Sequence, residues 1–408
     1  MNRLVALLVL GLVACEGSPS GAGADIAKEA DFQETLGDGG VPSDPLVAPD
    51  SLGLEEVQAD LGKSLDELEP LTGPAFYGPT GLALSGELVV VANSEFDGVT
   101  MSYGPGSVTF VRRHDLAPVA RMPTSRKNPA AVAISGSTAF VLCAGETSFD
   151  SEKGLVLPKS DGALDVFDLT FFETGPKVSI PVPVDPSKPL IGYPSSLALS
   201  PDGKRAWAGS GTAAVIFEFD LVTSKLVRTI ALGDLDRQDG ITLEVGQDGR
   251  IWAGSFNRDQ VYAFLPSDPA SRSAFTVGKS PSDMDGVVDI ALRPGASPDV
   301  FALLAMSSSI SAIDSTTGKV KDAFATTGLY PNRMARGADF LYVVNSGDNN
   351  VLAVNADTGK SDVVAVLPEK TNPWDIAVDG PSAFVTGNGS NSLFLVDIKA
   401  GKVVGEAK

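Results

Sequence analysis

The stretch Tyr342–Lys360 reads YVVNSGDNNVLAVNADTGK and contains two short runs in which apolar and polar residues alternate. Each run ends in a turn sequence, first Asn-Ser-Gly-Asp and then Asp-Thr-Gly-Lys. Such alternation between turn residues predicts half-buried β-strands, because Gly, Asn and Asp are favoured in tight turns. The stretch therefore predicts two adjacent antiparallel strands.

The same pattern recurs, so this hairpin is one copy of a repeat. The nearest copy is AFVTGNGSNSLFLVDIKAGKVV at 383–404, and another spans 205–230. A small, apolar segment precedes each copy. Aligning these segments gives successive spacings of 50, 65, 46, 47, 44 and 42 residues between Pro79, Pro129, Pro194, Gly240, Val287, Pro331 and Pro373. A period of this length is typical of repeat architectures.

Each unit predicts four antiparallel strands, which is the composition of a propeller blade. Seven units predict an all-β, seven-bladed β-propeller of four-stranded antiparallel blades over residues 76–408. Inserts interrupt the first two units at 96–106 and 145–162. The first and last units each contain four strands of their own, so we expect the ring to close by packing, with residues before Phe76 covering the seam.

The repeat resembles that of the YVTN-type propellers, which include surface-layer-type and lactonase-like seven-bladed proteins. The resemblance covers residues 76–408 and is clearest in the last two units. Lactonase-like members hold a divalent cation at the channel mouth with Glu, Asn and Asp oxygens. The resemblance therefore implies Glu146, Asn345 and Asn388 as candidate ligands for Ca²⁺ or Mg²⁺, which prefer oxygen donors.

The amino terminus has the layout of a bacterial lipoprotein signal. One Arg is followed by an apolar run from Leu4 to Val13, and Leu12-Val13-Ala14-Cys15 resembles a lipobox. The run is too short to span a bilayer. We expect residues 1–14 to be a signal peptide and Cys15 to be lipidated, which predicts export and anchoring to the inner or outer membrane. An ordinary signal peptide with a chance cysteine is the alternative.

Residues 15–75 predict an acidic tether between the anchor and the propeller. They contain fourteen acidic and two basic residues, and their first part is rich in Gly, Ser, Pro and Asp, which favours a flexible spacer. A short amphipathic helix is predicted near its end from residues at helical spacing: Leu54, Val57, Leu61, Leu65 and Leu68. This helix could dock on the propeller or fold on a partner.

The formal charge of −20 is unfavourable for contact with a phosphate backbone, so we expect no nucleic-acid partner. The cysteine count is two, and Cys143 lies in the apolar run AFVLCAG, which predicts a buried thiol without a disulfide partner. The single histidine, His114, follows a predicted third strand in RRHDL, at the outer rim. These residues favour neither a serine triad nor a zinc site.

Two aligned columns at the starts of the first strands predict a polar channel mouth. One column precedes the apolar pair of each first strand and contains Asp289, Arg333 and Asp375; the other lies three residues earlier and contains Tyr193, Asp239 and Tyr330. Carboxylates, an arginine and phenols at one mouth suit a small polar ligand or a hard cation. A solvated channel entrance would have the same composition.

Two functions follow from these observations. The first is a non-catalytic binding or interaction module, held at the cell envelope by its lipid, that binds an envelope protein or a small polar ligand. The inserts then offer Phe96, Tyr103 and Phe149 as apolar contacts. The alternative is a lactonase-like hydrolase in which a divalent cation polarises an ester near Asp289, Asp375 and Glu146.

Overall fold

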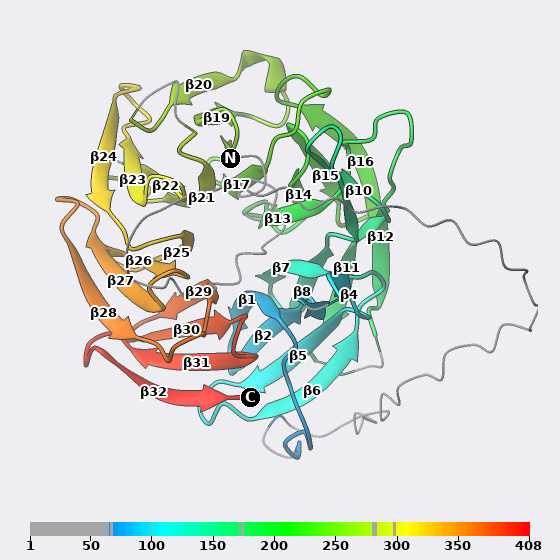
Figure 1. The fold of residues 1–408 in the computed structure, drawn as a ribbon, viewed down its shortest axis with the longest axis vertical. Helices are drawn as coiled ribbons and strands as arrows, with labels where there is room; N and C mark the ends of the chain where they lie inside the picture. The colour runs from blue at the N-terminus through cyan, green and yellow to red at the C-terminus, as the bar shows by residue number, and fades with distance from the viewer. Residues whose placement is uncertain are drawn as a thin grey trace, which may run out of the picture.

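Seven four-stranded antiparallel sheets form a ring around a central channel in the computed structural model (Figure 1). The structure describes residues 65, 68–98, 100–170, 172, 175–279, 284–296 and 299–408. The predicted seven-bladed propeller is therefore confirmed. The predicted signal sequence, Cys15 and most of the predicted amphipathic helix lie outside the described residues. No helix in the described part of the chain is long and apolar enough to cross a membrane.

Blades 1 and 2 each carry an extra hairpin, in the loop between the second and third strands. Blade 1 comprises β1 (Pro79–Ser85), β2 (Leu88–Asn93), β5 (Ser107–Arg112) and β6 (Pro118–Pro123), with the hairpin β3 (Phe96–Asp97) and β4 (Ser102–Tyr103). Blade 2 comprises β7 (Pro129–Ser135), β8 (Thr138–Cys143), β11 (Gly162–Asp168) and β12 (Val178–Val182), with the hairpin β9 (Thr147–Asp150) and β10 (Leu155–Pro158).

The other blades have four consecutive strands each. Blade 3 comprises β13 (Pro194–Leu199), β14 (Arg205–Ser210), β15 (Val215–Asp220) and β16 (Lys225–Ala231). Blade 4 comprises β17 (Ile241–Val245), β18 (Ile251–Ser255), β19 (Gln260–Phe264) and β20 (Ser273–Thr276), with the 3-10 turn η2 (Pro269–Ser271) before β20.

Blade 5 comprises β21 (Val287–Leu292), β22 (Val300–Leu304), β23 (Ser309–Ile313) and β24 (Val320–Thr326). Blade 6 comprises β25 (Pro331–Arg336), β26 (Phe340–Asn345), β27 (Asn350–Asn355) and β28 (Ser361–Val366). Blade 7 comprises β29 (Pro373–Asp379), β30 (Ser382–Gly387), β31 (Ser392–Asp397) and β32 (Lys402–Ala407).

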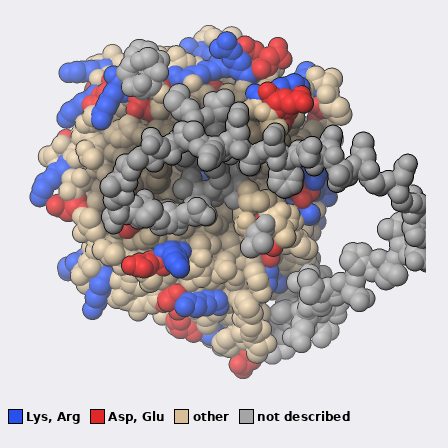
Figure 2. Space-filling model, in the orientation of Figure 1, with Lys and Arg blue, Asp and Glu red and all other residues tan. Residues whose placement is uncertain are grey.

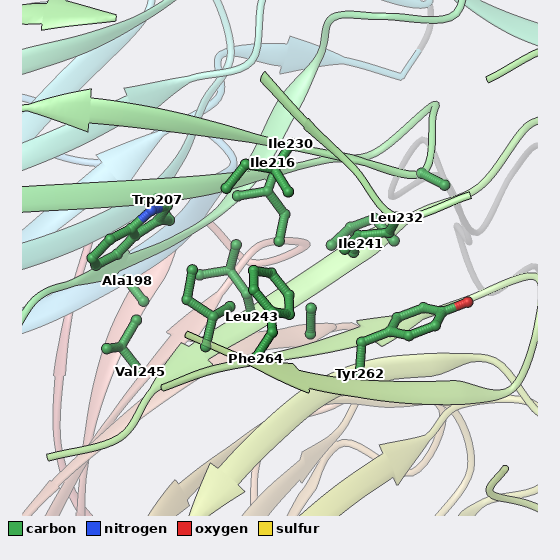
Figure 3. Close-up of a cluster of buried hydrophobic side chains, with 13 residues drawn as sticks. Ala198, Trp207, Ile216, Ile230, Leu232, Ile241, Leu243, Val245, Tyr262 and Phe264 are labelled. Atoms are coloured by element: carbon green, nitrogen blue, oxygen red, sulfur yellow. The ribbon is translucent and has the colours of Figure 1, made fainter. Parts of the chain in front are cut away.

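The core consists of apolar layers between neighbouring blades. The layer between blades 3 and 4 is typical: Trp207 of β14 lies beside Ala198 and Val245, and Leu243 lies close to Phe264 (Figure 3). Close approach of the blades depends on glycine where a Cβ would collide with the next inner strand. Gly209 has this role, because its Cβ would overlap the carbonyl oxygen of Ile241.

The seam between blades 1 and 7 closes without a shared strand, as expected, because every strand of both blades pairs within its own blade. Hydrogen bonds across the seam join Thr386 Oγ1 to the carbonyl of Thr80 (2.8 Å) and the Leu82 N–H to Asp375 (2.9 Å). Phe76 is buried in the apolar cluster that the two blades share. Leu65 and Leu68, from the proposed helix, pack against the layer between blades 1 and 2.

Charged side chains of both signs are interspersed around the face shown in Figure 2. Among the described residues on this face, lysine and arginine side chains lie mostly near the edge of the disc, next to aspartate and glutamate. Alternation of the two signs favours solubility over a strong electric field of one sign. The surface charge on this face therefore does not point to a ligand, and a binding site must be sought among the side chains at the channel.

Candidate functional site

A cavity of about 170 Å³ lies where the channel opens on the face that carries the two extra hairpins. We call it the mouth cavity. Every blade contributes to its wall. The aromatic lining residues are Phe96, Tyr103, Tyr193, Phe256 and Trp374, and the polar ones are Thr80, Ser94, Asn128, Ser195, Ser196, Thr242, Asn332, Arg333 and Asn388. Its volume is similar to that of an apolar cavity of about 150 Å³ known to hold benzene.

One residue of each inner strand forms the continuous part of this wall. These residues are Thr80, Ala130, Ser195, Ile241, Val288, Asn332 and Trp374. They lie one position before the column that contains Asp289, Arg333 and Asp375. In six blades the pairing of the first two strands shifts at this point, as between Pro331 and Arg333. Such a β-bulge redirects side chains, so simple alternation assigns them to the wrong face.

The column three residues before that of Asp289, Arg333 and Asp375 has a backbone role. Six of its seven members have positive φ, namely Gly78, Asn128, Tyr193, Gly286, Tyr330 and Asn372. Gly and Asn adopt this conformation readily, whereas a bulky tyrosine does so at a cost of about 1–2 kcal/mol. Tyr193 (φ +49°) is held there by a hydrogen bond from the Asn128 amide to its hydroxyl, at 3.2 Å.

Two tyrosines and a phenylalanine form an aromatic wall on one side of the mouth cavity. The rings of Phe96 and Tyr103 are 5.0 Å apart between centroids, and the Tyr103 hydroxyl faces that of Tyr193. Burial raises the pKa of both phenols. Both are therefore neutral at physiological pH. The hairpin of blade 1 thus turns Phe96 and Tyr103 toward the channel.

Arg333 is the cationic group of the mouth cavity. Its Nη1 donates to the carbonyl oxygens of Val288 (2.8 Å) and Asn332 (3.3 Å), which fixes the guanidinium between blades 5 and 6. Neither Nε nor Nη2 is hydrogen-bonded to another described residue. These donors are consequently available to a ligand, in the fork geometry that suits a carboxylate or a phosphate.

Asp289 and Asp375 flank Arg333 and connect neighbouring inner strands. The Met334 N–H donates to Asp289 at 2.7 Å, just as the Leu82 N–H donates to Asp375. Burial raises the pKa of Asp289 to about 6, with Arg333 and the Met334 N–H opposing that rise and Asp375 adding to it. Burial likewise raises the pKa of Asp375, against the effect of Arg333. Neither carboxylate is part of the mouth cavity wall.

Asp239 and Tyr330 also lie outside that wall. Asp239 is fully buried and organises a turn of blade 4. It accepts hydrogen bonds from the Ser255 hydroxyl (2.7 Å) and the Asn257 N–H (3.0 Å), and it pairs with Arg258 Nε at 3.1 Å. Burial raises the pKa of Asp239 in spite of these partners. Of the six residues predicted at the mouth, Tyr193 and Arg333 therefore line the cavity.

The three candidate cation ligands occupy different surroundings. Asn388 lines the mouth cavity. Asn345 accepts the Gly328 N–H (3.1 Å) and donates to Asn350 (2.7 Å), while Glu146 pairs with Lys127 at 3.0 Å. Within the described residues, no group of three or more His, Cys, Asp and Glu side chains is placed to hold a metal ion. Calcium or magnesium binding by Glu146, Asn345 and Asn388 stays a prediction.

The remaining candidates lie away from the cavity. Phe149, at the hairpin of blade 2, is 42% exposed, whereas Cys143 is a buried free thiol with a raised pKa caused by burial. His114 follows β5 on the opposite face of the disc and lies 3.7 Å from Asp115. Trp374 and Phe256 were missed from the sequence. Trp374 immediately precedes Asp375, so the alignment of the repeats already contained the column of wall residues, one position before the column that was chosen.

Comparison with solved structures finds the same fold in proteins of different function. Virginiamycin B lyase from Staphylococcus aureus shares 13% identity, with 79% of this chain and 95% of that chain covered and a TM-score of 0.58. A catalytically inactive histidine-to-alanine variant of that lyase, solved with quinupristin, gives the same TM-score and 13% identity, over 81% and 98% of the two chains. A functionally unknown protein from Desulfotomaculum acetoxidans shares 14% identity over 79% and 95%, with a TM-score of 0.54.

These similarities show the fold alone. No family model matches this chain, and no curated protein matches its sequence. The only histidine of this chain, His114, lies far along the sequence from the mouth residues of blades 3 to 7 and on the opposite face. Function must therefore be argued from the mouth cavity.

Proposed function

We propose that this protein is an exported lipoprotein whose propeller binds a small ligand in the mouth cavity without transforming it. The arrangement of residues 1–15 supports the anchor, because two or more acyl chains on Cys15 would hold a protein stably on a membrane. The acidic segment that follows supports a spacer between membrane and propeller. The ligand would be a flat, ring-containing carboxylate.

The single observation that carries this proposal is the position of Arg333 in the mouth cavity. Its guanidinium is fixed by two backbone carbonyls and retains free donors, while Phe256 and Trp374 supply apolar walls. A few placed polar groups within an aromatic lining are typical of small-molecule sites. A carboxylate on Arg333 would leave the ring of a ligand between those walls.

The surrounding polar groups support binding over catalysis. Asp289 and Asp375 already accept backbone N–H groups, and the Tyr193 hydroxyl accepts the Asn128 amide. These groups fix the shape of the cavity. The amide of Asn388 lies on the wall, with one N–H on the carbonyl of Pro79, and can orient a ligand through its other N–H and its oxygen.

Benzoate and benzamide are suitable probes, because they share a shape and differ in charge. Titrated into the full-length chain and followed by isothermal calorimetry, benzoate should bind at least about tenfold more tightly than benzamide, since it pairs with Arg333. Arg333→Met should remove that difference. Trp374→Leu should weaken both probes equally, because it changes only the apolar wall.

Equal affinity of the two probes, or benzoate binding unchanged in Arg333→Met, would contradict the binding site. The anchor is tested separately by labelling cells with a palmitate analogue. The wild-type chain should be labelled and found in the membrane fraction, whereas Cys15→Ser should be unlabelled. Labelling that persists in Cys15→Ser would contradict the lipoprotein assignment.

A further inference from the structure

A second and larger cavity, of about 780 Å³, opens on the face opposite the mouth cavity. We call it the rear cavity. Its described walls belong mainly to blades 4 and 5, and they include the turns that connect first to second strands. The volume lies within the range of about 300–1,000 Å³ that is usual for small-molecule sites. Neither the sequence columns nor the mouth cavity accounts for it.

One cross-strand row of blade 4 faces this cavity. Glu244 pairs with Trp252, Trp252 with Ala263, and Ala263 with Ser273. Residues paired directly across antiparallel strands point to the same face of the sheet. The small side chains of Ala263 and Ser273 leave room for the cavity. Trp252 stacks on Phe275, with 5.8 Å between the ring centroids. The wall of blade 4 thus combines a carboxylate with an aromatic pair.

Glu244 has no ion pair and no hydrogen-bonding side chain among the described residues. The backbone N–H of Val245 is the one hydrogen-bond donor beside the Glu244 carboxylate among the described residues. The carboxylate also faces the negative charge of Asp289. Burial and Asp289 together raise the pKa of Glu244 to about 7. An unpaired, desolvated carboxylate of this kind is stabilised by any cation that reaches it.

The other charged residues of the rear cavity are already satisfied or solvated. Arg250 pairs with Asp248 at 3.5 Å, and Asp299 accepts the Ser315 N–H at 2.8 Å. Arg336 is exposed and donates to the carbonyl of Leu292 at 3.4 Å. None of these groups neutralises Glu244. The rear cavity consequently lacks a positive charge beside the half-buried carboxylate of Glu244.

We propose that the rear cavity binds an organic ammonium ion with an aromatic body. The ammonium group would pair with Glu244, while its body would lie against Trp252 and Phe275. Aromatic faces attract organic cations and also bury apolar area, so both parts of such a ligand gain from this wall. The site is independent of Arg333 and of the ligand proposed for the mouth cavity.

The probes for this proposal are 2-phenylethylammonium, the neutral 2-phenylethanol and the anionic 3-phenylpropionate. Calorimetry on the full-length chain at pH 8 should show saturable, millimolar binding of the ammonium, at least about tenfold tighter than that of the alcohol. At pH 5.5 the affinity should fall by about 10- to 30-fold, because Glu244 is then mostly protonated. Glu244→Gln should abolish both the binding advantage and its pH dependence.

Two further variants separate the cavity from general surface charge. Ala263→Leu fills the cavity without changing any charge and should weaken the ammonium as much as the alcohol. Asp202→Asn is the control for surface charge. Asp202 occupies the turn of blade 3 that is equivalent to the Asp248 turn of blade 4, so this variant should leave ammonium binding unaltered. Unchanged ammonium binding in Glu244→Gln, tighter binding of 3-phenylpropionate, or no saturable binding of the ammonium at pH 8 would each overturn the proposal.

Discussion

Blades 3 and 4 share the motif Arg-x-Trp-Ala-Gly-Ser at their second strands, yet a carboxylate in the cross-strand row is buried and paired in blade 3 and half-buried and unpaired in blade 4. In blade 3 the cross-strand row contains Ala198, Trp207, Glu218 and Arg228. In blade 4 the equivalent row contains Glu244, Trp252, Ala263 and Ser273. The acid is on the third strand in one blade and on the innermost strand in the other.

This exchange decides whether the acid finds a partner. Glu218, only 3% exposed, pairs with Arg205 Nη1 at 2.8 Å and with Arg228 Nε at 2.6 Å, from the strands on either side. Glu244 has a single neighbouring strand, because it lies at the edge of the sheet beside the channel. A buried charge is tolerated when it is paired and hydrogen-bonded. Glu218 of blade 3 meets this condition. For Glu244 of blade 4 the partner would be the proposed ammonium ligand.

The packing around the two tryptophans differs accordingly. Trp207 packs against Ala198 and Val245 in an apolar layer, where its Nε1 has no partner among the described residues (Figure 3). Trp252 borders the rear cavity. The tryptophan of blade 3 is thus packed in an apolar layer without a hydrogen bond to its Nε1, whereas the tryptophan of blade 4 borders a cavity. The difference indicates a structural role for the first row and a binding role for the second.

The largest effect is expected from removing both partners of Glu218. The double variant Arg205→Met/Arg228→Met keeps the aliphatic packing but leaves a buried carboxylate alone. We expect the free energy of unfolding at pH 8 to fall by about 2–4 kcal/mol, below the usual figure for a buried pair because both arginines are partly exposed. Urea denaturation would measure it.

The pH dependence distinguishes this mechanism from lost packing. Burial without a partner penalises the charged form of an acid, and low pH relieves that penalty, so the loss in the double variant should be smaller at pH 5 than at pH 8. A loss of the same size at pH 5 and pH 8 would mean that the arginines act through their apolar stems. The comparison between paired and unpaired acids would then fail.

A smaller effect of opposite sign is expected from Glu244→Gln. The pKa of Glu244 is about 7 in the folded protein, against 4.5 for an ordinary glutamate. A raised pKa in an acid stabilises the fold at low pH, and this contribution disappears as the pH rises through 7. Without ligand, Glu244→Gln should therefore raise the unfolding free energy by about 1–2 kcal/mol at pH 8 and change it little at pH 5.

Thermal or urea unfolding of both proteins at the two pH values would measure this difference. The matched change Asp248→Asn, at an exposed position of the same cavity, should show no such pH dependence. If Glu244→Gln were destabilising at pH 8, then Glu244 would have a partner in the folded protein. That result would place blade 4 in the same class as blade 3.

The sequence was sufficient for the fold, since the blade period and the turn residues depend only on local chemistry. The seven repeats and the positions of the inserts followed from the spacing of the aligned segments and their turn residues, and closure without a shared strand followed from the four strands in both the first and the last unit. The site was less accessible. The β-bulge at the start of six inner strands moves the lining to the column of Asn332 and Trp374, one residue from that of Arg333 and Asp375.

The rear cavity could not be predicted from the residues alone. Glu244, in the segment ITLEV, alternates with apolar residues like an acid on the solvated face of a strand. Whether it has an ion-pair partner depends on the residues of blade 5 and of the channel that face it. Only the cross-strand register reveals that Ala263 and Ser273 leave space beside Trp252. Long-range pairing of this kind has no signal in a single sequence.

The smallest net effect is expected from converting the row of blade 4 into that of blade 3. The triple variant Glu244→Ala/Ala263→Glu/Ser273→Arg places the acid on the third strand and an arginine on the fourth. Arg250 already occupies the position equivalent to Arg205, so the new acid gains two partners. We expect the unfolding free energy at pH 7 to stay within about 1 kcal/mol of wild type, because one unpaired charge is replaced by a paired one.

The double variant Glu244→Ala/Ala263→Glu is the informative control, since it moves the acid without adding the arginine. It should be less stable than the triple variant by about 1–2 kcal/mol in urea denaturation at pH 7. The triple variant should also lose 2-phenylethylammonium binding, because the two new long side chains fill the rear cavity. If the triple variant bound the ammonium as well as wild type, neither the carboxylate of Glu244 nor the space beside Trp252 could be the basis of that site, even with the propeller intact.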